Sequence, residues 1–161
     1  MITLRLLRDE DIPLIRAWPR YPPEFSGLDY CLRDGGWLDE YRSKPGAEIL
    51  VAVEEGTIAG FSILSKDGPG IREFRIALHP DRIGRGVGST ITSLTLARGF
   101  SDPSVSAVRL IVRKNNIRAQ RLYTSLSFEK TGECTKEILG TPVQFFTMAI
   151  DRQKFSGVSR L

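Results

Sequence analysis

The residues of this chain with the clearest chemical purpose are alternate glycines between a strand-like run at 74–80 and a helix-like run at 87–100. They are Gly84, Gly86 and Gly88. Alternate glycines let backbone N–H groups converge on one point, and a helix start adds unpaired N–H groups and the positive end of its dipole. With Arg82 and Arg85 in the same run, the pattern predicts a cradle for phosphate oxygens. The plainer alternative is a tight strand-to-helix connection that needs glycine.

Two common nucleotide-binding loops do not fit this run. A dinucleotide loop would read G-x-G-x-x-G, but when Gly84 is the first position the sixth is Ser89, and no acidic residue ends a second strand about 20 residues on. A P-loop needs a Gly-Lys pair, which the sequence lacks. A different phosphate-bearing ligand is therefore expected.

A second motif follows at 107–128. Residues 107–112 form a β-branched run, and the following helical pattern carries one apolar stripe of Ala119, Leu122, Tyr123 and Leu126. Asn116 is placed to cap that helix. Taken alone, Tyr123 could be a core aromatic and Asn116 a cap and nothing more.

Together, the two motifs resemble those of the GNAT superfamily of N-acetyltransferases. Leu78-His79-Pro80 and residues 83–88 lie on the family's acyl-CoA-binding motif, and the run from Asn116 to Phe128 resembles its Asn, Ala, Leu-Tyr, Gly-Phe signature. Two motif positions differ: Ile83 replaces a usual Arg or Gln, and Ser127 replaces a glycine. Arg82, one place earlier, is the candidate source of the lost charge.

The resemblance implies acetyl-CoA as acetyl donor, with the pantetheine on the main chain of residues 76–78. The binding residues it implies are Ile76, Ala77, Leu78, Arg82, Ile83, Gly84, Arg85, Gly86, Val87, Gly88, Ser89, Asn116 and Tyr123. It also assigns Tyr123 as the general acid for the departing thiolate. Glu73 is the candidate base, with a solvated strand carboxylate, or proton transfer through water, as the alternative. His79, the one histidine, sits at a variable family position and is given no catalytic role.

The acceptor is expected to be a primary amine, on a small molecule or a peptide N-terminus. It should bind at the irregular segment 19–36, because loops on a rigid scaffold carry specificity. The candidate residues are Tyr21, Glu24, Phe25 and Tyr30, with Trp18 as a further wall and Asp29 and Asp34 as further carboxylates. The alternative for each aromatic is that it closes the edge of the core.

The elements that must position these residues alternate between strands and helices. Strands are expected near 2–7, 49–54, 57–64, 71–78, 107–112, 128–133 and 142–150, and helices near 37–43, 87–100 and 116–126. A further helix carries Ile12, Ile15 and Trp18, with Asp9 or Asp11 as its candidate cap. This order predicts a single-domain α/β fold over residues 1–150. Its central sheet is mixed and largely antiparallel, flanked by helices, with the cofactor cleft between the strands at 71–78 and 107–112. Residues 151–161 are expected to be a loose tail.

Composition sets the remaining limits. Of the 161 residues, 41% are hydrophobic and 26% are charged. No apolar run of the sequence approaches the length of a membrane span, which is about 20 residues. Met1 leads directly into a strand, and Cys31 and Cys134 share no metal-ligand spacing, which favours a cytoplasmic protein with reduced thiols and no metal. A homodimer is left open.

The net charge of +4 is modest. Its basic cluster at 113–121 lacks the interleaved aromatics of single-strand nucleic-acid binders, so attraction of an anionic cofactor is the preferred interpretation. The function expected is acetyl transfer from acetyl-CoA to an amine. The alternative, favoured by Ile83 and Ser127, is a catalytically weakened CoA-binding regulatory module.

Overall fold

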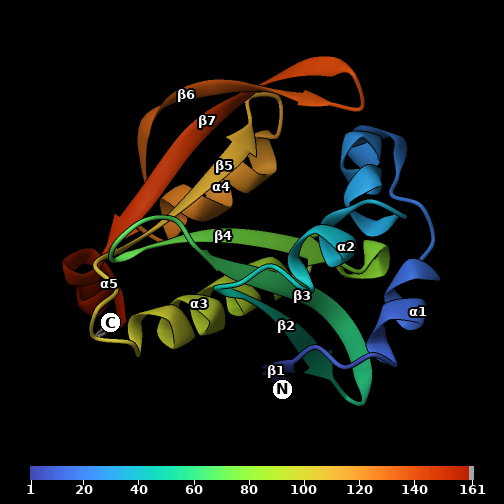
Figure 1. Ribbon diagram of the computed structural model, residues 1–161, viewed down its shortest axis with the longest axis horizontal. Helices are drawn as coiled ribbons and strands as arrows, with labels where there is room; N and C mark the ends of the chain where they lie inside the picture. Colours follow the sequence, from blue (N-terminus) through green and yellow to red (C-terminus); the bar gives the residue numbers. More distant parts are fainter. Residues whose placement is uncertain (160–161) are drawn as a thin grey trace. The chain divides into compact units, whose positions relative to one another are not determined.

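The computed structural model describes residues 1–159, whose strands form a seven-stranded sheet in the order β1-β2-β3-β4-β5-β7-β6 (Figure 1). Antiparallel pairing joins β1 to β2, β2 to β3, β5 to β7 and β6 to β7, and the β4–β5 pair is parallel. The mixed, largely antiparallel sheet confirms the expected fold class. The strands are β1 (Ile2–Leu6), β2 (Ala47–Glu54), β3 (Thr57–Lys66), β4 (Ile71–Leu78), β5 (Ala107–Arg113), β6 (Glu129–Ile138) and β7 (Thr141–Asp151).

The helices follow the expected order, with three additions, of which one is the short 3-10 helix η2. A 3-10 helix, η1, occupies much of the segment expected to be irregular, and α5 follows β7 directly. The helices are α1 (Asp11–Arg16), η1 (Pro23–Leu32), α2 (Trp37–Tyr41), η2 (Pro80–Arg82), α3 (Val87–Phe100), α4 (Ile117–Ser125) and α5 (Arg152–Ser159).

The chain divides into two compact units, of which the first comprises Met1–Ser65 and Arg75–Thr95. Its central strand β3 is buried from Ile58 to Ser65 because both faces of the sheet are covered. On one face Phe61 packs in a cluster with residues of α1, η1 and α2. On the other face Val87 and Ile91 of α3 pack against Ala52 and Ala59.

Gly60 of β3 permits the closest approach in this unit. A Cβ atom there would lie 2.8 Å from the Ala77 carbonyl oxygen of β4 and 2.9 Å from Cδ1 of Ile91 in α3. A larger residue would push the end of β4 or the start of α3 away from β3. The glycine thus sets the position of both elements that flank the glycine-rich loop.

The second unit comprises Lys66–Phe74 and the chain from Leu96 onward. The pairs Val108–Ile150 and Leu110–Met148 place four buried side chains on one face of β5 and β7. The register of β7 with β5 begins at Phe145, and just beyond it the Lys114 N–H donates to the Gln144 carbonyl. Residues 141–144 of β7 also pair with β6. Most of β6 is exposed, and its register shifts between Lys130 and Gly132.

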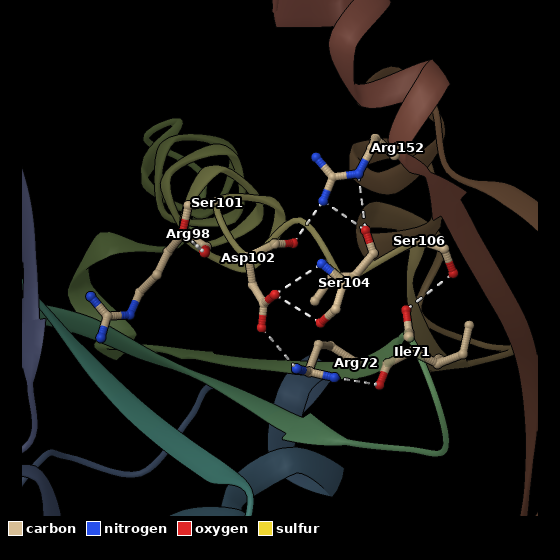
Figure 2. A network of polar contacts seen from close by, with 10 residues as sticks. Ile71, Arg72, Arg98, Ser101, Asp102, Ser104, Ser106 and Arg152 are labelled. Atoms are coloured by element: carbon tan, nitrogen blue, oxygen red, sulfur yellow. Dashed lines mark hydrogen bonds and ion pairs between the residues drawn. The ribbon is translucent and has the colours of Figure 1, made fainter.

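Helix α5 lies where the sequence predicted a loose tail. The Arg152 guanidinium donates to the Asp102 carbonyl (Figure 2) and to the Val105 carbonyl. The Arg152 N–H donates to the Ser106 carbonyl. The ring of Phe155 stacks on Phe100 with centroids 5.0 Å apart. The sequence showed no hydrophobic period here, and the recorded contacts of the helix include the polar ones of Arg152 and an ion pair of Lys154 with Glu129. Residues 160–161 lie outside the described part, and the domain boundary at 150 stays a prediction.

No helix within residues 1–159 is long and apolar enough to cross a membrane. Cys31 and Cys134 are both free thiols, as expected.

Candidate active site

The glycine-rich loop has the backbone geometry that a phosphate cradle requires. Gly84 and Gly86 have φ angles of 84° and 78°, in the left-handed region that favours glycine. A Cβ atom built on Gly86 would meet nothing within 4 Å, so the backbone there is open to a ligand. Helix α3 begins at the next residue, Val87, and presents its unpaired N–H groups beside these turns.

The two arginines of the loop differ in whether their charges are paired. Arg82 forms an ion pair and a hydrogen bond with Glu54, so its charge is compensated within the first unit. Ile83 packs against the hydrophobic cluster beneath α1 and η1, which gives that departure from the family motif a structural purpose. Arg85 is exposed, and within residues 1–159 it makes no ion pair or hydrogen bond. The loop's available side-chain charge is therefore that of Arg85.

The end of β4 directs its backbone groups alternately to its two edges. The His79 N–H donates to the Ala59 carbonyl at 2.9 Å, and the Ala77 carbonyl lies toward Gly60, so residues 77 and 79 face β3. Ile76 and Leu78 therefore face the opposite edge. The paired register of β4 with β5 covers Ile71–Glu73, and residues 76 and 78 lie beyond it.

His79 has a structural role in the connection that follows β4. Its Nδ1 accepts a hydrogen bond from the Asp81 N–H, which caps η2, and its ring lies 5.1 Å from that of Trp18. The ring is therefore packed, and one of its nitrogens is used in the cap.

In the second unit, α4 is bounded as its sequence predicts. The Asn116 side chain accepts from the Ala119 N–H at 3.1 Å, confirming the N-cap. At the other end, the Phe128 N–H donates to the backbone carbonyl of Tyr123, and the Ser127 N–H donates to that of Thr124. This is the pattern of a Schellman motif. Ser127 has a φ of 74°, so it adopts the conformation of the usual glycine at some cost in strain. The substitution leaves the turn regular.

Tyr123 is buried at the centre of an aromatic group. Its ring makes edge contacts with Phe74, at 6.2 Å between centroids, and with Phe128, at 5.6 Å. Burial alone raises the pKa of the Tyr123 phenol above its ordinary value. The phenol therefore keeps its proton at neutral pH, as a general acid must.

Glu73 belongs to a charged group on the adjoining strands. Its carboxylate lies 4.0 Å from the Arg109 guanidinium, which also pairs with Asp67. The Glu73 side chain is 16% exposed, so it is not the freely solvated carboxylate of the plainer alternative. Arg109 was not expected from sequence, because its approach to Glu73 depends on the parallel register of β4 and β5.

The residues expected to bind the acceptor fall into two groups. Tyr21 is buried, and its hydroxyl donates to the Leu78 carbonyl at 2.7 Å. Phe25 and Tyr30 are partly buried against the same cluster, and Glu24 is exposed. Acceptor binding by these four residues stays a prediction.

Two carboxylates of this segment already have partners. Asp29 is 7% exposed and accepts hydrogen bonds from Arg20, from Nε and Nη2 of Arg33, and from the Tyr21 N–H. These contacts, led by Arg33, hold the pKa of Asp29 below its usual range. Asp34 lies 3.7 Å from Arg16. Asp29 therefore organises the segment instead of offering a bare charge to a cationic acceptor.

Gln120 was not expected from the sequence: its side-chain amide donates to the carbonyls of Arg113 and Lys114 and so fixes the turn into α4. A polar residue in a helical run carries no signal of such a contact. Among residues 1–159, no group of three or more His, Cys, Asp or Glu side chains is arranged to hold a metal ion.

Comparisons with known proteins agree with this geometry. The model of the acetyltransferase (GNAT) family matches residues 12–128. Spermidine N-acetyltransferase from Vibrio cholerae, solved with CoA and spermine, is 20% identical with a TM-score of 0.77, covering 96% of this chain and 98% of that one. An aminoglycoside acetyltransferase solved with coenzyme A and kanamycin is 20% identical with a TM-score of 0.77 and 98% coverage of both chains.

A third structure, an acetyltransferase of the GNAT family from Streptococcus pneumoniae, is 17% identical with a TM-score of 0.69, covering 94% of this chain and 99% of that one. These likenesses show a shared fold. A comparison with curated proteins found no match. The family model spans both motifs, the glycine-rich loop and the run from Asn116 to Phe128. The chain belongs to the acetyltransferase (GNAT) family.

Proposed function

We propose that this protein transfers the acetyl group of acetyl-CoA to a primary amine, on a small molecule or a peptide N-terminus, by direct attack in a ternary complex. The observation that carries the proposal is the glycine-rich loop. Two glycines in the left-handed region, one with open space where a side chain would project, lead directly into α3. This backbone fits the pyrophosphate of CoA, with Arg85 as its exposed positive charge.

The pantetheine and thioester would lie along the end of β4. Ile76 and Leu78 direct their main-chain groups to the edge away from β3, where the Leu78 carbonyl accepts from the Tyr21 hydroxyl and an extended ligand can pair with the other groups. A main-chain N–H there could polarise the thioester carbonyl. The loop and this strand end follow one another in the chain, so one extended ligand can use both.

The reaction then needs two proton transfers. The amine nitrogen attacks the thioester carbonyl carbon, the C–N bond forms and the C–S bond breaks. Tyr123, protonated at neutral pH, would give its proton to the CoA thiolate. Glu73, beside the Arg109 guanidinium, would accept the amine proton directly or through water.

The alternative of a weakened regulatory module has one structural feature in its favour, since Arg82 is paired with Glu54 and Ile83 adds no charge. The regular turn at Ser127, which leaves Tyr123 in a complete α4, argues for catalysis.

Two measurements on one preparation distinguish a transferase from a regulatory module. The first is thiol release from acetyl-CoA in the presence of polyamines, aminoglycosides, amino acids and short peptides. The second is binding of acetyl-CoA by calorimetry. Amine-dependent release supports the transferase. Binding without release from any amine would indicate the regulatory module, and absence of binding would overturn both.

A further inference from the structure

One peptide unit joins the two backbone segments proposed to bind acetyl-CoA. The peptide between Leu78 and His79 ends β4 and begins the connection to the glycine-rich loop. It is held at both edges: its N–H donates to Ala59 of β3 at 2.9 Å, and its carbonyl accepts from the Tyr21 hydroxyl at 2.7 Å. A peptide fixed on both sides cannot rotate about its flanking bonds without losing one of these bonds.

The Tyr21 bond lies on the edge of β4 that faces away from β3. Ala77 and His79 direct their groups to β3, so the Leu78 carbonyl points to the other edge, beside the main-chain groups proposed for pantetheine. Strand β5 pairs with β4 at residues 71–73 and does not reach residue 78 in this register. The phenol therefore serves as the hydrogen-bond partner that a neighbouring strand would otherwise supply.

Tyr21 is itself held firmly in place. Its side chain is 8% exposed, and its N–H donates to the buried Asp29 carboxylate. Arg20 and Arg33 bind the same carboxylate, and Arg33 also donates to the Arg16 carbonyl. Burial raises the pKa of the Tyr21 phenol, so the hydroxyl remains a donor at neutral pH.

We propose that Tyr21 is a positioning residue for acetyl-CoA. By fixing the Leu78–His79 peptide, it aligns the end of β4 with the glycine-rich loop, so that one ligand can engage both segments together. This inference rests on the proposed function, because it assumes that acetyl-CoA binds along residues 76–89. It also changes the role expected for Tyr21, from lining the acceptor site to ordering the donor site.

The test compares two probes on Tyr21→Phe, which keeps the buried ring and removes the hydroxyl. Acetyl-CoA would span the strand end and the loop, whereas adenosine 3′,5′-bisphosphate, the nucleotide portion of CoA, would use the loop alone. Calorimetry should show acetyl-CoA binding weakened by about fivefold, the loss of one hydrogen bond, and the nucleotide changed by less than about twofold. An unchanged affinity for acetyl-CoA, or an equal loss for both probes, would overturn the inference.

Tyr41→Phe is a matched control. Tyr41 is 3% exposed and lies in the same unit, and its hydroxyl accepts a hydrogen bond from the Arg75 side chain at 2.7 Å. Both variants should lower the melting temperature, and Tyr41→Phe should bind acetyl-CoA normally. An equal loss of affinity in Tyr41→Phe would mean that general destabilisation, not positioning, explains the result.

Hydrogen exchange on the unmodified protein gives a second readout that does not depend on folding of a variant. Saturating acetyl-CoA should slow exchange in peptides covering 76–79 and also in peptides covering 16–33, through the Tyr21 contact. Protection of 76–79 with no change in 16–33 would contradict the inference. If the unmodified protein binds the nucleotide but not acetyl-CoA, the proposed function fails first, and if it binds both, the variants decide the role of Tyr21.

Discussion

At the scale of single residues, Tyr123 combines a buried ring with a hydroxyl proposed for chemistry. Tyr123→Phe keeps the ring contacts with Phe74 and Phe128. We expect turnover with the best amine of the panel to fall by about 10²- to 10⁴-fold, while acetyl-CoA affinity and melting temperature change little. Steady-state kinetics and a melting curve on one preparation would check this. Normal turnover in the folded variant would remove Tyr123 from the mechanism.

Gly86 tests the phosphate cradle at one backbone position. Gly86→Glu places a carboxylate where an anion should approach, and we expect acetyl-CoA affinity measured by calorimetry to fall by more than about tenfold. Gly140→Glu is the control: its φ of 79° matches the 78° of Gly86, and its Cβ would also meet nothing within 4 Å. Equal affinities in the two variants would exclude a ligand at Gly86.

At the scale of an element, the end of α4 carries strain that can be removed. Ser127 occupies the left-handed position of a Schellman motif, where glycine has no steric penalty. We expect Ser127→Gly to raise the free energy of unfolding in urea by about 1 kcal/mol. Ser125→Gly, within the helix two residues earlier, should lower it by about 0.5–1 kcal/mol. A loss of stability in Ser127→Gly would show that the serine side chain stabilises the turn.

Segment 16–33 should make unfolding sensitive to acid. The pKa of Asp29 is lowered in the folded protein, chiefly by the Arg33 hydrogen bond, so the folded state keeps this carboxylate ionised at lower pH than the unfolded chain does. The contribution of this carboxylate to the free energy of unfolding is complete above the ordinary Asp pKa of about 4 and is lost as the pH falls through the lowered pKa. Urea unfolding between about pH 3 and 7 should therefore show a smaller acid loss in Asp29→Asn than in the unmodified protein. Parallel curves for the two proteins would refute this role.

At the scale of the whole molecule, the C-terminal helix contacts the second unit through Arg152. Arg152 donates three hydrogen bonds to the carbonyls of Asp102 and Val105. We expect Arg152→Ala to lower the free energy of unfolding by about 1–3 kcal/mol and to leave acetyl-CoA binding unchanged. Gln153→Ala, at an exposed neighbour, should change neither the free energy of unfolding nor acetyl-CoA binding. A loss of acetyl-CoA affinity in Arg152→Ala would connect α5 to the site after all.

The features that could be predicted from sequence are those governed by local rules. Strand and helix periodicity located the sheet elements, alternate glycines located the loop, and a side-chain oxygen before a helical run located the cap at Asn116. The length of β6 and the presence of η1 were missed because both depend on packing and pairing instead of local pattern.

Contacts between distant residues were beyond such rules. Tyr21 and Leu78 are separated by 57 positions, and Arg82 and Glu54 by 28. Nothing in the local sequence indicates that one tyrosine reaches a strand carbonyl or that one arginine is neutralised. The docking of α5 was missed for the same reason, since Arg152 and Val105 are 47 positions apart.

The exposed strand β6 bears on how this protein behaves at high concentration. An open strand edge can template growth of a sheet from one molecule to the next, the first step toward fibrils. Lys130, Glu133, Lys136 and Glu137 place charges of both signs along β6, and the irregular register near Thr131 interrupts its hydrogen-bonding edge. These features make β6 a poor template, so the protein can keep a long, solvent-facing edge strand and remain dispersed.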